Sequence, residues 1–415
     1  MANRSDKTHI LLRYSYAWAR AEYSPPPTTA FGGRPDSVWG ARRVRPHPPC
    51  RTLQCVESSR NLSPPRDTLY WSVTRRSGTP AILPVMKFFL TLAIAVLPAC
   101  AQPAPLDFLN HNRPVPDAHN CYPYDGQWAD RIDRALKLGF PVGIEQDMAW
   151  YVDPATGKGL AVVTHSAKTN GSEPLLRTHF FERVRPIVEK ALRDNDRAHW
   201  PLIVLHFDFK DTQAPLLHAV WDILGEYQDW ITTAVKTADP HQLAPFEPKP
   251  LLVLTEDSDE QEEVFFHQVS VGAKLRLFGS AHTKPVSASA RAEREHLLAI
   301  VPPEELLSTP PTNYRRWWNN SWFVVEEGGQ HQAGDWTAAD ERRLRALVDH
   351  AHKLGYWIRF YTLDGFAQSE DRGWGNAYNF GTREAAMARW KAAIAAGVNL
   401  IASDQYEDLA AVMGR

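Results

Sequence analysis

The chain has 415 residues, with 46 Lys or Arg and 48 Asp or Glu, so its overall charge is close to neutral. The charges are unevenly placed, because residues 1–85 hold 13 basic and 5 acidic residues with 11 prolines, while the remainder holds 33 basic and 43 acidic residues. Nucleic acid is therefore excluded as an expected partner of the acidic remainder. The basic start shows no period of two or of 3.6, which predicts a disordered segment.

Residues 86–101 have the features of a secretory signal peptide. Met86 and Lys87 form a charged start, residues 88–97 are apolar, and Ala99-Cys100-Ala101 is a small-residue cleavage site before Gln102. The apolar run is too short to span a bilayer. We therefore predict an exported protein, extracellular or periplasmic, that begins at Gln102.

A signal peptide works at the start of a chain, so we predict translation from Met86, with residues 1–85 a mis-annotated upstream start. A nucleic-acid-binding arm or a transit peptide is the alternative interpretation of that basic segment. Residues 97–100 also resemble a bacterial lipoprotein signal, in which Cys100 would carry a lipid anchor and give peripheral membrane contact.

Residues 102–415 alternate between short β-rich runs and longer segments of helical period, which is typical of a parallel sheet. The predicted strands are 115–120, 142–147, 160–165, 202–209, 251–254, 275–278, 322–326, 357–362 and 400–403. The predicted helices are 127–138, 175–193, 214–236, 337–354 and 382–396. Gly139, Gly355 and Gly397 follow helices as C-caps. The pattern predicts a single-domain α/β fold, a TIM-type (β/α)8 barrel. Nine strands exceed the eight required, so at least one is a hairpin piece or an error.

Ionisable residues stand at the ends of the first four predicted strands, where a barrel of this type carries its active site. They are His119, Glu145, Asp147, His165, Asp208 and Lys210. Glu145 and Asp147 are two residues apart on one strand and therefore face the same side, as do Asp208 and Lys210. Each residue alone is more often a solvated edge or a satisfied core group. Together, three carboxylates in a barrel interior require a cation, and oxygen ligands with open positions suit one divalent metal, Mg²⁺ or Ca²⁺.

With these residues, the chain resembles the superfamily of phospholipase-C-like phosphodiesterases. This superfamily includes glycerophosphodiester phosphodiesterases, phosphatidylinositol phospholipase C and sphingomyelinase D. The matching segments are His119-Asn120, Gly143-Ile144-Glu145-Gln146-Asp147, His165, Asp208-Phe209-Lys210, Arg359-Phe360-Tyr361-Thr362 and residues 397–404. The resemblance implies His119 and His165 as catalytic residues, and Glu145, Asp147 and Asp208 as metal ligands. It also implies phosphate contacts from Lys210 and Asn120.

The implied activity is a metal-dependent phosphoric diester hydrolase, with His119 as base and His165 as acid. The nucleophile is either water or a hydroxyl of the substrate, and the second gives a cyclic phosphate. The expected substrate is a small-molecule or lipid phosphodiester, and the expected state is a monomer. Ser166 replaces an Asp that glycerophosphodiesterases commonly carry, and the step from Asp147 to His165 is longer than in that family. Both departures argue against glycerophosphodiester as the substrate.

Aromatic residues are concentrated at 314–322. Trp317 or Trp318 forms either part of the core or a wall for a substrate headgroup. Tyr361 and Asp364 lie near the expected rim, and residues 374–381 form either a loop over the mouth or a connection.

Two other functional classes stay open. One is a glycoside hydrolase that uses Glu145 and Glu326 as its acid and base. The other is a catalytically inactive barrel kept as an exported binding protein.

Overall fold

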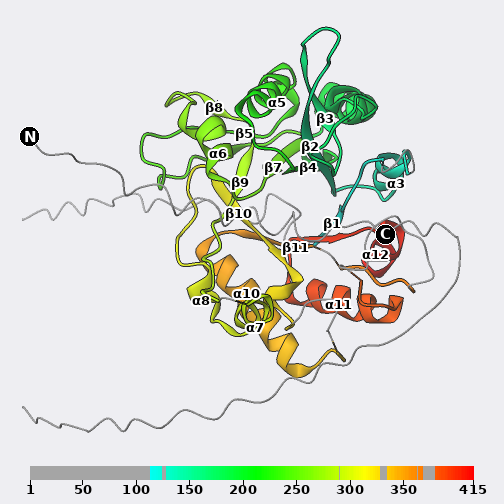
Figure 1. Cartoon of the computed structure of the whole chain (residues 1–415), viewed down its shortest axis with the longest axis vertical. Coiled ribbons are helices and arrows are strands. Elements are labelled where there is room, and N and C mark those ends of the chain that lie inside the picture. The colour runs from blue at the N-terminus through cyan, green and yellow to red at the C-terminus, as the bar shows by residue number, and fades with distance from the viewer. Residues whose placement is uncertain (1–112, 124–127, 289, 328–333, 362, 368–378) are drawn as a thin grey trace, which may run out of the picture. The chain divides into compact units, whose positions relative to one another are not determined.

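The computed structural model describes residues 113–123, 128–288, 290–327, 334–361, 363–367 and 379–415 (Figure 1). The predicted disordered start, the signal peptide and Cys100 lie outside these residues, as do Thr362 and most of the 374–381 loop. None of the helices in the described ranges is long and apolar enough to cross a bilayer.

Within the described residues, eight parallel strands close into a barrel, which confirms the predicted fold class. They are β1 (Val115–Ala118), β2 (Val142–Val152), β4 (Ile203–Phe209), β7 (Leu251–Thr255), β9 (Phe278–Ser280), β10 (Arg315–Ser321), β11 (Trp357–Tyr361) and β12 (Leu400–Ser403). The ring is closed because β1 pairs with β2 on one side and with β12 on the other. Parallel closure brings the carboxyl ends of all eight strands to one rim.

Helices alternate with these strands along the chain. They are α3 (Arg131–Lys137), α4 (Glu182–Asp194), α5 (Ala214–Glu226), α6 (Asp259–Glu262), α7 (Arg291–Ile300), α8 (Pro303–Leu306), α10 (Ala338–Leu354), α11 (Arg383–Ala396) and α12 (Tyr406–Val412). Thr337 and Asp340 form a capping box at the start of α10. Gly355 and Gly397 end α10 and α11 with φ values of 96° and 84°, which confirms the predicted glycine C-caps.

Two apolar clusters hold the fold together. One lies against the first half of the barrel and α4 and α5, and it includes the buried rings of Trp317 and Trp357. The other lies between the later strands and helices α10 and α11, and it includes Trp318, Trp322 and Trp390. The rim that carries the site is therefore set on a scaffold packed on all sides by large side chains.

Four predicted elements differ from the structure in position or type. The strand predicted at 160–165 is β3 (Gly159–Val163), which runs antiparallel to β2 as a hairpin outside the barrel ring. The strand predicted at 322–326 begins as a 3₁₀ turn (Trp322–Val324), and the barrel strand is β10 just before it. Polar residues in β10 obscured its strand pattern. Asn319 points into the polar barrel interior, and Arg315 belongs to a cluster of ion pairs.

The helix predicted at 214–236 ends at Glu226, and the rest forms β5 (Thr233–Val235). This strand pairs with β6 (Phe246–Glu247) and β8 (Lys274–Leu275) in a small antiparallel sheet. The predicted strand at 275–278 is divided between β8 and β9.

Candidate active site

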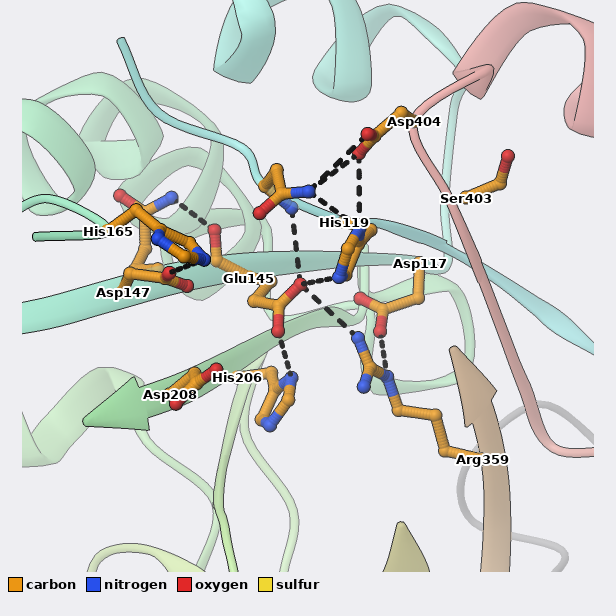
Figure 2. A network of polar contacts seen from close by, with 12 residues as sticks. Asp117, His119, Glu145, Asp147, His165, His206, Asp208, Arg359, Ser403 and Asp404 are labelled. Atoms are coloured by element: carbon orange, nitrogen blue, oxygen red, sulfur yellow. Dashed lines mark hydrogen bonds and ion pairs between the residues drawn. The ribbon is translucent and has the colours of Figure 1, made fainter. Parts of the chain in front are cut away.

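Glu145 lies at the centre of a polar network at the carboxyl ends of the strands (Figure 2). Its carboxylate is buried and lies 3.5 Å from His119 Nε2 and 3.4 Å from Arg359 Nη2. The backbone N–H of Asn120 donates to it at 3.2 Å. Burial acts to raise the pKa of Glu145, but the charges of His119 and Arg359 outweigh it and lower this pKa.

Three carboxylates converge beside this centre. Oxygens of Glu145, Asp147 and Asp208 all lie within 4.8 Å of one another. The parallel register of β2 and β4 explains this, because Asp147 pairs with Asp208 across the ladder. Lys210 lies at the same place, with its Nζ 3.0 Å from Asp147 Oδ2 and 2.6 Å from Asp208 Oδ2.

Lys210 is the amine that contacts Asp147 and Asp208, and it acts on the pKa values of both. Burial, together with the neighbouring carboxylates of Asp208 and Glu145, raises the pKa of Asp147 to about 7, although Lys210 opposes the shift. Burial also acts to raise the pKa of Asp208, but Lys210 lowers it overall. Two of these carboxylates are buried and that of Asp208 is half-buried, and such a set of oxygen donors fits a divalent cation.

His119 follows β1 and is held by residues of the last barrel strand. Its Nδ1 lies 3.1 Å from Asp404 Oδ1, and Asp404 follows β12. Asp364 accepts hydrogen bonds from Ser403 Oγ at 2.6 Å and from the backbone N–H of Asp404 at 2.7 Å. Burial lowers the pKa of His119, but the nearby Glu145 and Asp404 overcome this effect and raise it to about 9.

His165 reaches the site from the hairpin rather than from a barrel strand. The backbone N–H of Thr164 donates to the carbonyl of Asp147 at 2.9 Å, and His165 Nε2 then lies 4.0 Å from Asp147 Oδ2. Partial burial and the charge of Lys210 lower the pKa of His165.

Asn120 is committed to the protein at several atoms. Its backbone is in the left-handed region with φ of 50°, and its Nδ2 donates to Asp404 at 3.2 Å. The hydroxyl of Tyr122 lies 2.6 Å from Asn120 Oδ1 and 2.7 Å from Asp147 Oδ2. The structure therefore places Asn120 beside the cluster, with its side chain bound by neighbouring residues.

Of the two predicted pocket residues, Tyr361 lies at the site and Trp318 does not. The ring of Tyr361 stacks on His119 with centroids 6.3 Å apart, and Arg359 lies 5.4 Å from its centre. Trp318 is fully buried in the outer apolar cluster, and its Nε1 donates to Thr283. Trp318 was wrongly predicted as pocket lining, because successive residues of β10 point to opposite faces.

Sequence reasoning assigned no role to several residues that the barrel brings to the network. They are Asp117, Tyr122, His206, Glu256, Asn319, Arg359, Asp364 and Asp404, of which Asp364 was expected only near the rim. His206 stands two residues before Asp208, so the same spacing rule that selected Asp208 and Lys210 places it on the inner face. Asp117 and Glu145, the acidic partners of Arg359, are more than 200 residues away in sequence, and no local pattern indicates them.

In the glycoside hydrolase alternative, Glu145 and Glu326 form the acid and base pair, but Glu326 is not available for this role. Glu326 is buried, and Arg389 binds it through two nitrogens at 2.9 and 2.6 Å, while Trp322 Nε1 donates to it at 2.6 Å. This carboxylate is fully engaged in the outer helix layer, so it is not available as a glycosidase acid or base beside Glu145.

Comparison with known proteins adds little to this description. No family model matches the chain, and no curated protein matches it. Among solved structures, a glycerophosphoryl diester phosphodiesterase from Parabacteroides distasonis shares 12% identity, covering 75% of this chain and 90% of its own, with a TM-score of 0.33. HPPK-DHPS from Plasmodium falciparum shares 9% identity over 72% of this chain, with a TM-score of 0.37, and the match spans 46% of that protein. Both similarities are too low to support an argument about function.

Proposed function

We propose that this barrel is a metal-dependent phosphoric diester hydrolase. The observation that carries the proposal is the convergence of Glu145, Asp147 and Asp208 beside two histidines and Lys210. Three acidic oxygens around one point fit a divalent cation, and imidazoles on either side fit proton transfer. Oxygen donors alone favour Mg²⁺ or Ca²⁺.

Different groups at the site have different roles in an in-line displacement at the phosphodiester. A bound cation would withdraw charge from a non-bridging phosphate oxygen. Lys210 adds a positive contact for the same phosphate, since its amine lies at the edge of the carboxylate cluster. One imidazole removes the proton of the nucleophile and the other protonates the leaving oxygen.

His165 is the histidine more exposed to solvent, with 38% of its side chain accessible against 10% for His119. This difference supports substrate entry from the side of His165. The proposed substrate is a small-molecule or lipid phosphodiester, attacked by water or by its own hydroxyl. The second route gives a cyclic phosphate, and product analysis by phosphorus NMR distinguishes the two.

The test is hydrolysis of bis-p-nitrophenyl phosphate, followed by lysophospholipids, with Mg²⁺, with Ca²⁺ and with EDTA. We expect metal-dependent turnover that falls by about 100-fold or more in His119→Ala and in His165→Ala, because each removes a proton-transfer group. His218→Ala, an exposed histidine on α5, is the matched control and keeps the wild-type rate. A folded, metal-loaded protein that turns over no diester contradicts the proposal and favours the inactive binding barrel.

We also propose that residues 86–101 direct export, which the sequence features alone support. N-terminal sequencing of the protein recovered from its native cells tests this. A mature start at Gln102 supports plain secretion, and a lipid-modified Cys100 supports the anchored form. A chain that retains residues 1–85 contradicts both.

A further inference from the structure

A second pocket lies outside the barrel ring, between α5 and the segment that leads from the π-helical turn Glu263–His267 to β8. Figure 1 shows α5 and β8 next to each other. The volume of about 430 Å³ is within the range of small-molecule sites, roughly 300–1,000 Å³. No residue of the polar network around Glu145 is among the described residues that line it. We infer that this pocket binds a small organic anion, whose carboxylate or phosphate group pairs with Arg276.

The guanidinium of Arg276 is held in place on one face of α5. Its Cζ lies 4.4 Å from the centre of the Trp221 ring, and a Cβ added at Gly225 would lie 3.6 Å from the same atom. Trp221 and Gly225 are four residues apart and are therefore neighbours on the helix surface. Arg276 Nε donates to Gln228 Oε1 at 2.8 Å. The side chain is thus ordered by the protein itself, which lowers the entropy cost of binding a ligand.

The two terminal nitrogens of Arg276 have no acceptor among the described residues. Burial lowers the pKa of Arg276, and the charge of Asp222 opposes this shift only in part. Within the described ranges no carboxylate forms an ion pair with this guanidinium. A planar fork of N–H donors that is partly removed from water is matched by a bidentate carboxylate or phosphate.

Two other arginines show the usual solution to the same burial. Burial also lowers the pKa of Arg343 and of Arg316. Arg343 donates to three backbone carbonyls, and Arg316 donates to two. The protein therefore supplies acceptors to both of these side chains. Arg276 has only the amide oxygen of Gln228, so acceptors for its terminal nitrogens come from water or from a ligand.

The walls of the pocket favour an anion that has an apolar body. No acidic side chain is among the described residues that line it, although residues 86–415 hold 33 basic and 43 acidic residues. Lys274 also lines the pocket, but Glu247 binds its amine at 2.7 Å. Trp221, Val264 and Val269 add apolar surface. An inorganic ion would leave this surface in water, whereas an organic anion covers it.

Ligand-detected NMR titration of the full chain measures binding of benzoate, phenyl phosphate, benzamide and acetate. Benzoate and phenyl phosphate carry the same ring, so they show which anionic group the pocket prefers. Benzamide has nearly the shape of benzoate but no charge, and it should bind about 10-fold more weakly because it forms no ion pair with Arg276. Acetate should also bind about 10-fold more weakly, since it has no ring to cover the apolar wall.

Arg276→Gln should weaken binding of the preferred anion by about 10- to 100-fold, because hydrogen bonds to a charged group are lost. Arg276→Lys keeps the charge but not the planar fork, and it should weaken binding by about 3- to 10-fold. Arg342→Gln, at an exposed position on α10, changes the charge equally and should bind as the wild type does. Wild-type affinity in both folded Arg276 variants overturns the inference.

A phosphate monoester also fits beside Lys210, so the titrations are repeated in Lys210→Gln, in which binding at Arg276 should remain. Binding that is lost in Lys210→Gln and kept in Arg276→Gln overturns the inference. Wild-type protein that binds neither benzoate nor phenyl phosphate also overturns it, and so does benzamide that binds as tightly as benzoate. These last two results need no Arg276 variant that folds.

Discussion

Asp364 shows how a single buried carboxyl connects pH to stability in this fold. It is buried near His119, and it accepts hydrogen bonds from Ser403 and from the backbone of Asp404. Burial, and then the charge of Asp404, raises the pKa of Asp364 from 3.8 to about 7. Because the folded pKa is above the unfolded one, its stabilising contribution is complete below pH 4 and is lost as the pH rises through 7.

Asp364→Asn should therefore stabilise the protein at pH 8, by about 1–3 kcal/mol, and should not do so at pH 4. The amide oxygen can still accept from Ser403, so the hydrogen bond is kept. Urea unfolding of wild type and variant at both pH values measures the difference. Asp349→Asn, an exposed carboxylate on α10, changes the charge equally and should leave both values unchanged. If the free energies of unfolding of Asp364→Asn and wild type differ by the same amount at pH 4 and at pH 8, the raised pKa of Asp364 is contradicted.

Between neighbouring strands, Gly143 of β2 makes room for a charged pair in the barrel interior. A Cβ atom at this position would overlap the carboxylate of Asp117 on β1. That carboxylate binds Arg359 Nε, and Arg359 lies in turn beside Glu145. The absence of a side chain at Gly143 thus allows three strands to bring their charges together.

Gly143→Ala should destabilise the protein by about 1–3 kcal/mol, because neither Asp117 nor the barrel wall can move without cost. Urea unfolding measures this loss. Gly334→Ala is the matched control, since a Cβ there meets no atom within 4 Å and should change stability by less than about 0.5 kcal/mol. Equal stability of Gly143→Ala and wild type would mean that β1 and β2 separate easily.

The hairpin explains why the sequence interval between Asp147 and His165 is long. β2 continues past the rim to Val152, and β3 returns antiparallel to it. Because Met148 pairs with Val163, the return brings His165 back beside Asp147. The residue was predicted at the site from the resemblance, although the strand that carries it was misjudged as part of the barrel.

Across the whole molecule, the barrel could be predicted because its helices have capped ends and its strands have apolar runs. Most of β1, β2, β4, β7, β11 and β12 follow that pattern. β10 does not, because Asn319 faces the polar interior and binds Glu256 and Arg359. Residues such as Arg359 and Asp404 acquire their partners only when the ring closes, so their place at the site follows from tertiary structure and not from local spacing.

Because the carboxylates meet only when the ring closes, a bound cation should stabilise the entire fold. Glu145, Asp147 and Asp208 meet only in the folded barrel, so a cation that binds them stabilises the folded chain, by about 2.7 kcal/mol at 100 times its dissociation constant. For a barrel of this size that is a rise of several degrees in the thermal midpoint. Calorimetric melting with EDTA, with Mg²⁺ and with Ca²⁺ measures it. The double variant Asp147→Asn with Asp208→Asn should show no rise when metal is added. In EDTA, its thermal midpoint should be lower than that of the wild type only because the Lys210 contacts are lost. An equal rise in both proteins would place the bound metal elsewhere, and a rise in neither would mean that the three carboxylates hold no cation.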